Sequence, residues 1–474
     1  MDNNGTAPRR PNPRRRKRSK FQRFMQSYFY VLLVALLAIL VTVIIIVAVS
    51  KSNKRKEEER MASIAASQSE EAERLRQEAE AQSLIKQAEV LAAGFDYDGA
   101  IAILDTFADN DNYFSNQALL DKRFEYITAK EAMVAWDDPG EIVHLSTHFL
   151  LHETARSFAN ANYGGTYKYN NITTVEFSNI LDSMYSNGYI LISVDDIVEE
   201  VINEDGSVTL KAKTLYLPEG RIPFLLTQTH NSPTYVYDND GDGKRDYASG
   251  IAYKLVFDED TGKLTGEVTD KQDKITHGDN NLILILEKFI QEHPDFSYKG
   301  ARATLAITGK NAIFGYYTNP KYKSILGETE YNKEVDTAKQ VAEELRAMGY
   351  TFACYTYGNK AYGKLSQEEM QADLDSWKKE VEPIVGPVNT LVYAMNSDIA
   401  GSDEEYSGSK YAALTVAGFR YYMGFCDSSS TPWAQLTDSY FRQGRIIING
   451  NSLITDPDLY KGIFDAVGAK DSKR

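Results

Sequence analysis

One segment near the N-terminus constrains the chain most. Residues 28–50 form an uncharged run of 23 residues dominated by Val, Leu, Ile and Ala, and about 20 such residues span a bilayer core as one helix. Residues 1–27 carry nine Arg or Lys against one Asp, a net charge of +8, so the remainder of this −15 chain carries −23. Because positively charged flanks stay on the cytoplasmic side, we predict a single-pass cell-membrane protein. It has a basic cytoplasmic arm (1–27), a transmembrane helix (28–50) and an extracellular C-terminal domain.

A cleaved signal peptide would also begin with a basic region followed by an apolar run. Its apolar core is normally about 7 to 15 residues long, and no small-x-small cleavage site follows a shorter core here. We therefore favour an uncleaved signal-anchor. We interpret the basic arm as an orientation signal in contact with anionic lipid, and we expect no nucleic-acid partner because the rest of the chain is strongly acidic.

The composition indicates one large domain with accessory segments. The chain has 474 residues, 43% of them hydrophobic, and a mean hydropathy of −0.41 that argues against a polytopic membrane protein. Two cysteines are too few for a disulfide-stapled miniprotein. Cys354 and Cys426 are expected as buried, reduced thiols, and a disulfide formed outside a cell is the alternative.

Two helical segments are predicted between the membrane and the main domain. Residues 51–93 are rich in Glu, Ala, Gln, Lys and Arg and contain no Pro, which predicts a helical stalk. The apolar positions of the stalk do not keep a clean heptad, so a coiled-coil dimer is only weakly supported. Residues 94–138 are predicted as a helical hairpin, with helices over 97–107 and 116–136, that acts as a spacer.

From residue 139 to 474 apolar strands alternate with helices. This alternation predicts parallel strands in an α/β barrel or a doubly wound sheet, with reactive groups at the C-terminal ends of the strands. We expect Thr174 to cap one helix, and Ser366 with Glu369 to form a capping box at another. A polar stretch over 200–220 predicts a β-hairpin, and residues 231–280 predict a long inserted loop. The candidate strands are 141–148, 189–194, 221–227, 301–307, 350–356, 390–394, 419–424 and 445–449.

Three histidines, His144, His148 and His152, are spaced by four residues. On a helix this spacing would place three imidazoles on one face and suggest a metal cluster. The local sequence begins as a strand, however, where residues four apart lie about 13 Å from each other. We therefore expect His148 alone to line a site at the end of the strand.

An acidic segment over 238–249 matches the start of a calcium loop. Oxygen ligands fall at alternating positions and Gly243 permits the turn, but the twelfth position is Ser249 where a Glu is expected. A structural calcium site and an acidic solvated turn are both compatible with the pattern. A second acidic turn, 258–262, is predicted as a hairpin turn. The candidate calcium ligands are Asp238, Asp240, Asp242 and Asp246.

Tyrosines are abundant, and those near the ends of predicted strands can offer stacking faces for sugars. The candidates are Tyr355, Tyr357 and Tyr393, although packing at the edge of the core is the simpler role for most tyrosines. No Walker loop, dinucleotide-binding glycine pattern, nucleophile-elbow serine or kinase motif set is present, so nucleotide chemistry and serine hydrolysis lack support.

Several segments follow one another in a recognisable order. They are 148–158, the helix after Thr174 leading into 188–194, 221–228, 293–298 and 381–387. Together they cover about residues 140–470 and resemble the polysaccharide deacetylase family (carbohydrate esterase family 4 type), in particular its membrane-anchored, wall-facing members from Gram-positive bacteria. The resemblance implies a distorted (β/α) barrel with a bound divalent metal, usually zinc. It also implies an enzyme that removes acetyl groups from N-acetylated sugars of cell-wall or exopolysaccharide chains.

The positions that carry the family's chemistry differ in this chain. Where the family places two aspartates after a strand, this chain has Thr229 and His230, and Thr229 cannot accept a proton at neutral pH. Where the family has two metal-binding histidines four residues apart, this chain has Tyr355 and Asn359. Asn449 follows the strand that should precede the family's late acid histidine.

The resemblance therefore implies a retained fold and sugar-facing groove with metal-dependent deacetylation lost. Two metal ligands, His230 and His148, are the most that this alignment offers, although a shifted register could bring Asp398 or Asp427 into the site. The first hypothesis is a pseudoenzyme that binds wall glycan or a wall-enzyme partner at the envelope. The alternatives are a divergent zinc-dependent deacetylase of peptidoglycan or another envelope polysaccharide, and a structural spacer.

Overall fold

The computed structural model describes residues 20–474 except 161–163, 230–249, 253, 270–273 and 427–431. The chain divides into two compact units, one ending at Gln82 and one spanning residues 83–474. Each unit is described by itself. The candidate residues His230, Asp238, Asp240, Asp242, Asp246 and Asp427 lie outside the described residues.

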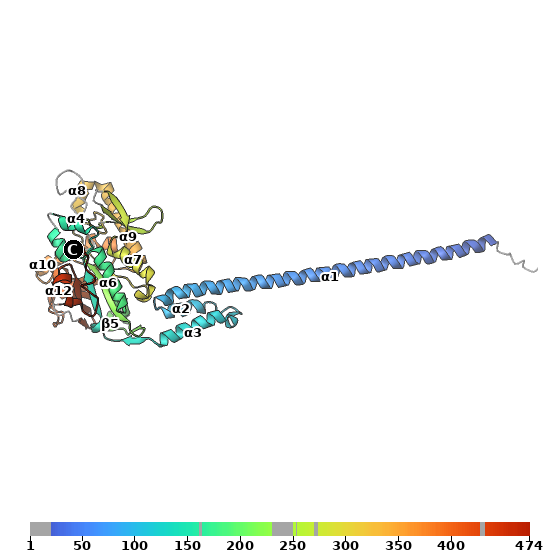
Figure 1. The fold of residues 1–474 in the computed structure, drawn as a ribbon, viewed down its shortest axis with the longest axis horizontal. Coiled ribbons are helices and arrows are strands. Elements are labelled where there is room, and N and C mark those ends of the chain that lie inside the picture. The colour runs from blue at the N-terminus through green and yellow to red at the C-terminus, as the bar shows by residue number, and fades with distance from the viewer. Residues whose placement is uncertain (1–19, 161–163, 230–249, 253, 270–273, 427–431) are drawn as a thin grey trace, which may run out of the picture. The chain divides into compact units, whose positions relative to one another are not determined.

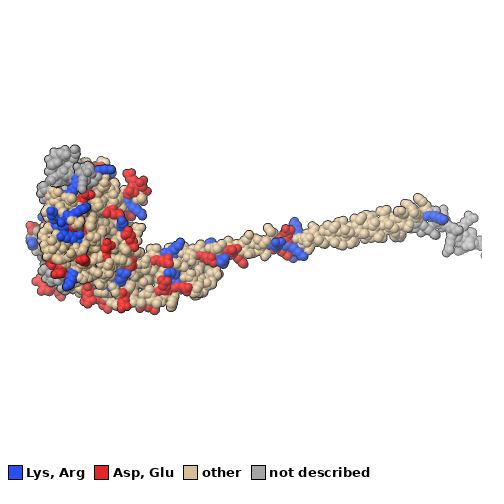
Figure 2. Space-filling model, in the orientation of Figure 1, with Lys and Arg blue, Asp and Glu red and all other residues tan. Residues whose placement is uncertain are grey.

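The described part of the first unit is a single helix, α1 (Lys20–Ala93), whose last residues belong to the second unit. Residues 28–50 and the segment after them lie on this one helix (Figures 1 and 2). Ion pairs four residues apart, such as Arg55–Glu59 and Arg74–Glu78, support its polar half. Within the part of the chain that the structure describes, α1 is the one helix long and apolar enough to cross a membrane, which is compatible with an anchor or a signal sequence.

The second unit begins with a helical hairpin, α2 (Tyr97–Asp105) and α3 (Gln117–Glu131). Asp96 and Asn116 cap the two helices, and Arg123 binds Asp105 between them at 2.6 Å. The predicted helix 116–136 is too long. The helix ends at Glu131, and β1 (Val134–Trp136) pairs with β6 (Leu215–Leu217). Pairing with a distant strand outweighs the local helical pattern there.

Seven parallel strands close into a barrel in the order β2-β7-β11-β12-β13-β14-β16. The pairing of β7 with β11 and that of β16 with β2 complete the closure. This architecture confirms the predicted distorted (β/α) barrel. The barrel strands are β2 (Val143–Thr147), β7 (Ile222–Thr229), β11 (Thr304–Ile307), β12 (Thr351–Cys354), β13 (Thr390–Val392), β14 (Tyr421–Phe425) and β16 (Phe441–Ile448).

Helices cover the outside of the barrel (Figure 1). Outward-facing strand residues such as Leu226 and Leu305 join one core cluster with Phe177 and Trp377 from the helices. Thr173, one residue before the predicted Thr174, is the cap of α6, because its side chain accepts the Glu176 N–H. The helices are α4 (Thr154–Ala159), α5 (Gly164–Asn170), α6 (Thr174–Ser186), α7 (Leu282–Glu292), α8 (Lys323–Leu326), α9 (Glu328–Ala347), α10 (Gln367–Glu380), α11 (Glu382–Val385), α12 (Gly408–Val416) and α13 (Ser452–Thr455).

The remaining strands decorate the barrel. β3 (Tyr189–Leu191) pairs with β7, β15 (Ala434–Leu436) pairs with β16, and β4 (Val198–Ile202) with β5 (Val208–Ala212) forms the predicted hairpin. The prediction of a loop over 231–280 is wrong for its described part, which is a three-stranded antiparallel sheet. Its apolar residues Leu255 and Val268 are buried and so favour strands. These strands are β8 (Lys254–Phe257), β9 (Leu264–Thr269) and β10 (Ile275–Gly278), with the predicted turn 258–262 between the first two.

The interior of the barrel is polar where β2, β7 and β16 meet. His144 Nδ1–H donates to Gln443 Oε1 at 3.0 Å, and His144 Nε2 accepts from the Thr227 hydroxyl at 2.7 Å. Gln443 Nε2 in turn donates to the Ile142 carbonyl at 2.9 Å. Burial lowers the pKa of His144 to about 3, so the imidazole is neutral inside the folded barrel at pH 7.

The depressed pKa of His144 predicts acid sensitivity. An unfolded histidine titrates near 6.5, so the unfolded state binds more protons between about pH 6.5 and pH 3, and stability falls as the pH falls through that window. Between pH 7 and pH 5 this group alone lowers the unfolding free energy by about 2 kcal/mol. Urea unfolding of the full chain in detergent at both values measures it. His144→Asn should show a shallower pH dependence, and an unchanged slope would contradict the assignment.

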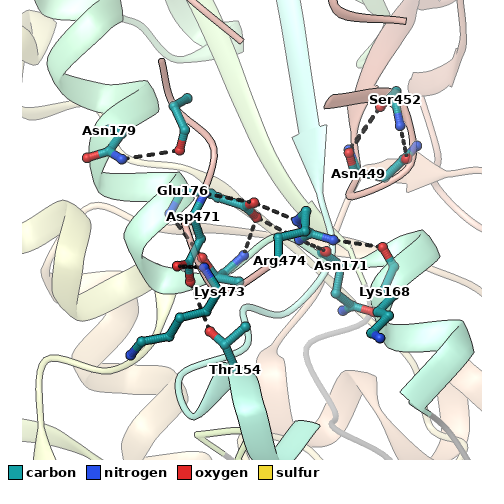
Figure 3. A network of polar contacts seen from close by, with 12 residues as sticks. Thr154, Lys168, Asn171, Glu176, Asn179, Asn449, Ser452, Asp471, Lys473 and Arg474 are labelled. Atoms are coloured by element: carbon teal, nitrogen blue, oxygen red, sulfur yellow. Dashed lines mark hydrogen bonds and ion pairs between the residues drawn. The ribbon is translucent and has the colours of Figure 1, made fainter. Parts of the chain in front are cut away.

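A buried ion pair fastens the C-terminal segment to the barrel (Figure 3). The Glu176 carboxylate accepts the Thr173 N–H at 2.8 Å, the Asp471 N–H at 3.2 Å and two N–H groups of Arg474 at 2.5 and 2.6 Å. The two side chains of the pair are 0% and 2% exposed. Arg474 also donates to the carbonyls of Lys168 and Asn171, which ties it to the segment around α5.

Removing one partner leaves the other charge buried. We expect Arg474→Ala to destabilise the folded domain by about 3 to 5 kcal/mol, because the Glu176 carboxylate then lacks its cation. The matched control is Lys473→Ala, since Lys473 is exposed. Equal urea midpoints for the two variants would refute a stabilising role for the pair.

Candidate functional site

A pocket of about 890 Å³ opens at the C-terminal ends of the barrel strands. Because all seven strands run in parallel, their C-terminal ends meet at one end of the barrel, where the sites of α/β barrels are built. The pocket receives His148 after β2, Thr229 at the end of β7 and Tyr355 directly after β12. Asn359 and Asn449, from the loops after β12 and β16, complete the set of predicted positions that line it.

Three other residues that the sequence suggested for the site, Tyr357, Tyr393 and Asp398, do not line this pocket. The Tyr357 hydroxyl binds Glu380 and accepts from Asn319 Nδ2 at 2.9 Å, and Tyr357 is not among the lining residues. Tyr393 is fully buried and stacks on Tyr422 with ring centroids 6.4 Å apart. Asp398 binds Arg442 at 2.9 Å and does not line the pocket. Tyr355 is therefore the one predicted sugar-binding tyrosine that reaches the pocket.

The pocket contains a buried arginine that the sequence did not indicate. Arg445 is 1% exposed and lines the pocket. Its Nε donates to the Gly424 carbonyl at 2.8 Å, Nη1 to Ser146 Oγ at 3.1 Å and Nη2 to the Tyr393 carbonyl at 3.1 Å. Burial lowers the pKa of Arg445 to about 10, which leaves the guanidinium protonated at pH 7.

His148 is neutral beside this cation. Its Nδ1 hydrogen-bonds with the Thr229 hydroxyl at 2.9 Å. Desolvation of the ring, together with the positive charge of Arg445, lowers the pKa of His148 to about 4. Burial raises the pKa of the Tyr355 hydroxyl, which therefore also stays neutral at pH 7. His144 lies deeper in the barrel and His152 is exposed, so the three spaced histidines do not converge.

The described residues do not fit a zinc ion. A catalytic zinc needs three protein ligands such as imidazole, thiolate or carboxylate, and no group of three or more His, Cys, Asp or Glu side chains among the described residues is arranged to hold a metal. His148 hydrogen-bonds with the Thr229 hydroxyl and is subject to the positive charge of the Arg445 guanidinium. Neither group is a zinc ligand of the usual kind. Nearby positive charge also opposes the binding of a divalent cation.

Amides and aromatic rings form much of the pocket wall. The Asn359 Oδ1 atom is buried and has no hydrogen-bond partner in the part of the chain that the structure describes. Asn171 is anchored by donating its Nδ2 to the Phe149 carbonyl at 2.8 Å. Among the described lining residues Asp456 is the one carboxylate, and its side chain is exposed. Cys426, buried and reduced like Cys354, also lines the pocket. The other amide and aromatic lining residues are Tyr167, Tyr169, Asn170, Asn396, Phe425 and Asn451.

Left-handed backbone conformations gather at the mouth of the pocket. Thr356 and Asn359, after β12, have φ values of 59° and 57°, and Met395 and Asn396, after β13, have values of 54° and 52°. Such values are costly for residues with a Cβ, above all for β-branched Thr356. The Asp373 carboxylate holds the first loop by accepting the N–H groups of Tyr357 and Gly358. Strain of this kind concentrates at functional sites.

Comparisons with known proteins add little to this site. No family model matches the chain, and no curated protein sequence matches it. Solved structures similar to it include the deacetylase PplD of Streptococcus pyogenes in complex with acetate, with 13% identity, 65% of this chain and 93% of that chain covered, and a TM-score of 0.32. Another is the Bacillus anthracis protein BA0330, described as a polysaccharide deacetylase, with 11% identity, 65% of each chain covered and a TM-score of 0.33. At these TM-scores we infer nothing from the two structures, and the assignment of the fold depends on the strand pairing described above.

The strain at Met395 predicts a difference between two substitutions. Met395 is 65% exposed, so its side chain contributes little packing. We expect Met395→Gly to be up to about 1 kcal/mol more stable than Met395→Ala, because only glycine adopts the positive φ without steric cost. Urea unfolding of the two variants in the full chain measures the difference. A more stable alanine variant would show that the loop does not hold this conformation.

Proposed function

We propose that the barrel domain is a catalytically degenerate, polysaccharide-deacetylase-like module that binds glycan at the cell envelope. One observation carries the proposal: the pocket at the barrel mouth is retained, while four of the positions where the family resemblance requires metal ligands or proton-transfer groups are Thr229, Tyr355, Asn359 and Asn449. All four are uncharged at pH 7. The domain thus has room for a ligand without the groups that hydrolyse an amide.

The chemistry of the described residues favours binding over catalysis. Deacetylation requires a water molecule activated by a metal ion or a general base. With a pKa of about 4, His148 is a weak base at pH 7, and Arg445 opposes its protonation. Asp456, the carboxylate among the described lining residues, is exposed in the segment after α13.

The lining suits a sugar. Aromatic side chains such as Tyr167 and Tyr169 offer faces for the C–H side of a pyranose ring, and the asparagines offer donors and acceptors to its hydroxyl groups. The pocket volume lies within the usual range for small-molecule sites. Cell-wall glycan of a Gram-positive bacterium is the ligand class that we propose, and a wall-enzyme or other envelope protein is the second candidate partner.

The proposed location follows from the N-terminal segment. The basic residues before α1 and the apolar run within it support a single-pass signal-anchor with the N-terminus in the cytoplasm. The barrel domain then faces the cell wall. A dimer through the stalk is a secondary part of the proposal, and the lack of a clean heptad in the stalk argues against it.

The test combines metal content, acetate release and binding on the full chain in detergent. We expect no stoichiometric transition metal by elemental analysis. We also expect no acetate release from N-acetylated peptidoglycan fragments with added zinc, cobalt or manganese, but saturable binding of those fragments by calorimetry. About one equivalent of transition metal with acetate release would establish the divergent deacetylase instead. His148→Ala should leave metal content unchanged. The absence of metal, release and binding together would leave the spacer hypothesis.

A further inference from the structure

The pocket floor carries a positive charge that lacks a carboxylate partner among the described residues. The other two deeply buried arginines are paired: Arg442 binds Asp398 at 2.9 Å and Arg474 binds Glu176 at 2.5 Å. Neither of them lines the pocket. Arg445 lines it, and among the described residues its guanidinium donates to two carbonyl groups and the Ser146 hydroxyl. The charge of Asp398, which pairs with Arg442, acts on Arg445 without forming an ion pair with it. A buried charge is costly unless it is paired. Unlike Arg442 and Arg474, Arg445 therefore still needs an anionic partner.

The guanidinium has donors to spare. Arginine carries five N–H groups in a planar fork, and Arg445 uses three of them in the hydrogen bonds described above. One N–H on Nη1 and one on Nη2 remain, and guanidinium groups bind carboxylates through pairs of N–H groups. The neighbouring His148 and Tyr355 are neutral, so they do not supply the missing negative charge.

The rest of the described lining keeps the pocket electropositive. Lys310 and Asp456 both line it and both are exposed. Their opposite charges offset each other in solvent, which leaves the buried charge of Arg445 as the net charge of the described lining. This positive pocket belongs to a chain with a net charge of −15. Low-dielectric walls strengthen the attraction of such a site for an anion.

A second buried group without a full set of partners, which we call an orphan group together with the Arg445 guanidinium, indicates what else the ligand carries. The buried Asn359 Oδ1 atom has no hydrogen-bond donor among the described residues, and a buried acceptor without a donor is costly. A ligand hydroxyl group would satisfy it. A ligand with a carboxylate and hydroxyl groups therefore complements both orphan groups, whereas a neutral sugar complements only one.

We propose that the pocket binds an acidic sugar, with its carboxylate on Arg445 and a hydroxyl group on Asn359. This inference rests on the proposed function, because it specifies the glycan class for the same pocket. It differs from the deacetylase expectation, in which the floor of the site holds a cation and a carboxylate base. The site instead supplies the cation itself, and the ligand supplies the carboxylate.

The test compares three matched sugar pairs on the full chain in detergent at constant ionic strength. The pairs are glucuronate with glucose, galacturonate with galactose, and N-acetylmuramate with N-acetylglucosamine. Each pair differs by one carboxylate-bearing group. Titrated shifts of the thermal unfolding midpoint give the Kd values. We expect the acidic member of at least one pair to bind at least tenfold more tightly than its neutral partner. Equal shifts within all three pairs, including no shift, would overturn the inference.

Variants connect the effect to the two orphan groups. Arg445→Lys keeps a cation but loses the planar fork, and it should weaken binding of the acidic sugar at least tenfold with little effect on its neutral partner. Asn359→Asp should weaken the acidic sugar selectively by placing a like charge in the pocket. Lys323→Ala, at an exposed lysine paired with Glu328 outside the lining, is the control. Unchanged acidic binding in both pocket variants, each with native circular dichroism, would also overturn the inference.

Two further outcomes separate related explanations. Competition by inorganic phosphate at a lower concentration than that required for acetate would overturn the carboxylate assignment in favour of phosphate. Binding of neutral peptidoglycan fragments without preference for acidic sugars would overturn this inference and leave the proposed function intact. The two proposals can therefore fail separately.

Discussion

Closure of the parallel barrel is the constraint on which the rest of the structure depends. The pairing of β7 with β11 and of β16 with β2 forces alternate residues of every strand into a narrow interior. It also brings all strand C-termini to one end. His148 and Asn449 lie 301 positions apart in the sequence, yet both line one pocket because their strands are neighbours in the barrel.

The interior that closure creates is unusually polar for a packed barrel. His144, Thr227 and Gln443 satisfy one another by hydrogen bonds, and the depressed pKa keeps the imidazole neutral. Arg445 lies two residues after Gln443 on β16, nearer the mouth of the barrel. Hydrogen bonds to neutral acceptors hold it in place there. Desolvation of the ring, together with this fixed cation, keeps His148 neutral. The same cation opposes the binding of a divalent metal.

Much of the fold could be predicted from the sequence, because strands and helices alternate with clear apolar patterns and caps such as Ser366 with Glu369. The pocket positions Thr229, Tyr355, Asn359 and Asn449 could be found because each lies at, or shortly after, the end of a predicted strand. Tyr393 could not be placed, because one position along a strand decides whether a side chain faces the helices or the interior. Arg445 could not be found from the sequence for a related reason. The sequence predicts a strand over 445–449, whereas β16 is Phe441–Ile448, so the predicted strand does not contain the alternation of Gln443 and Arg445.

We propose that this barrel holds a fixed guanidinium where the deacetylase resemblance implies a metal centre. Diffraction data collected at the zinc absorption edge, from crystals of the full chain grown with excess zinc, test it most directly. The account predicts no anomalous peak beside His148 and an Arg445 guanidinium facing the pocket without a bound cation. An anomalous peak within coordination distance of His148 would contradict it, because the site would then hold the metal that the described residues do not fit.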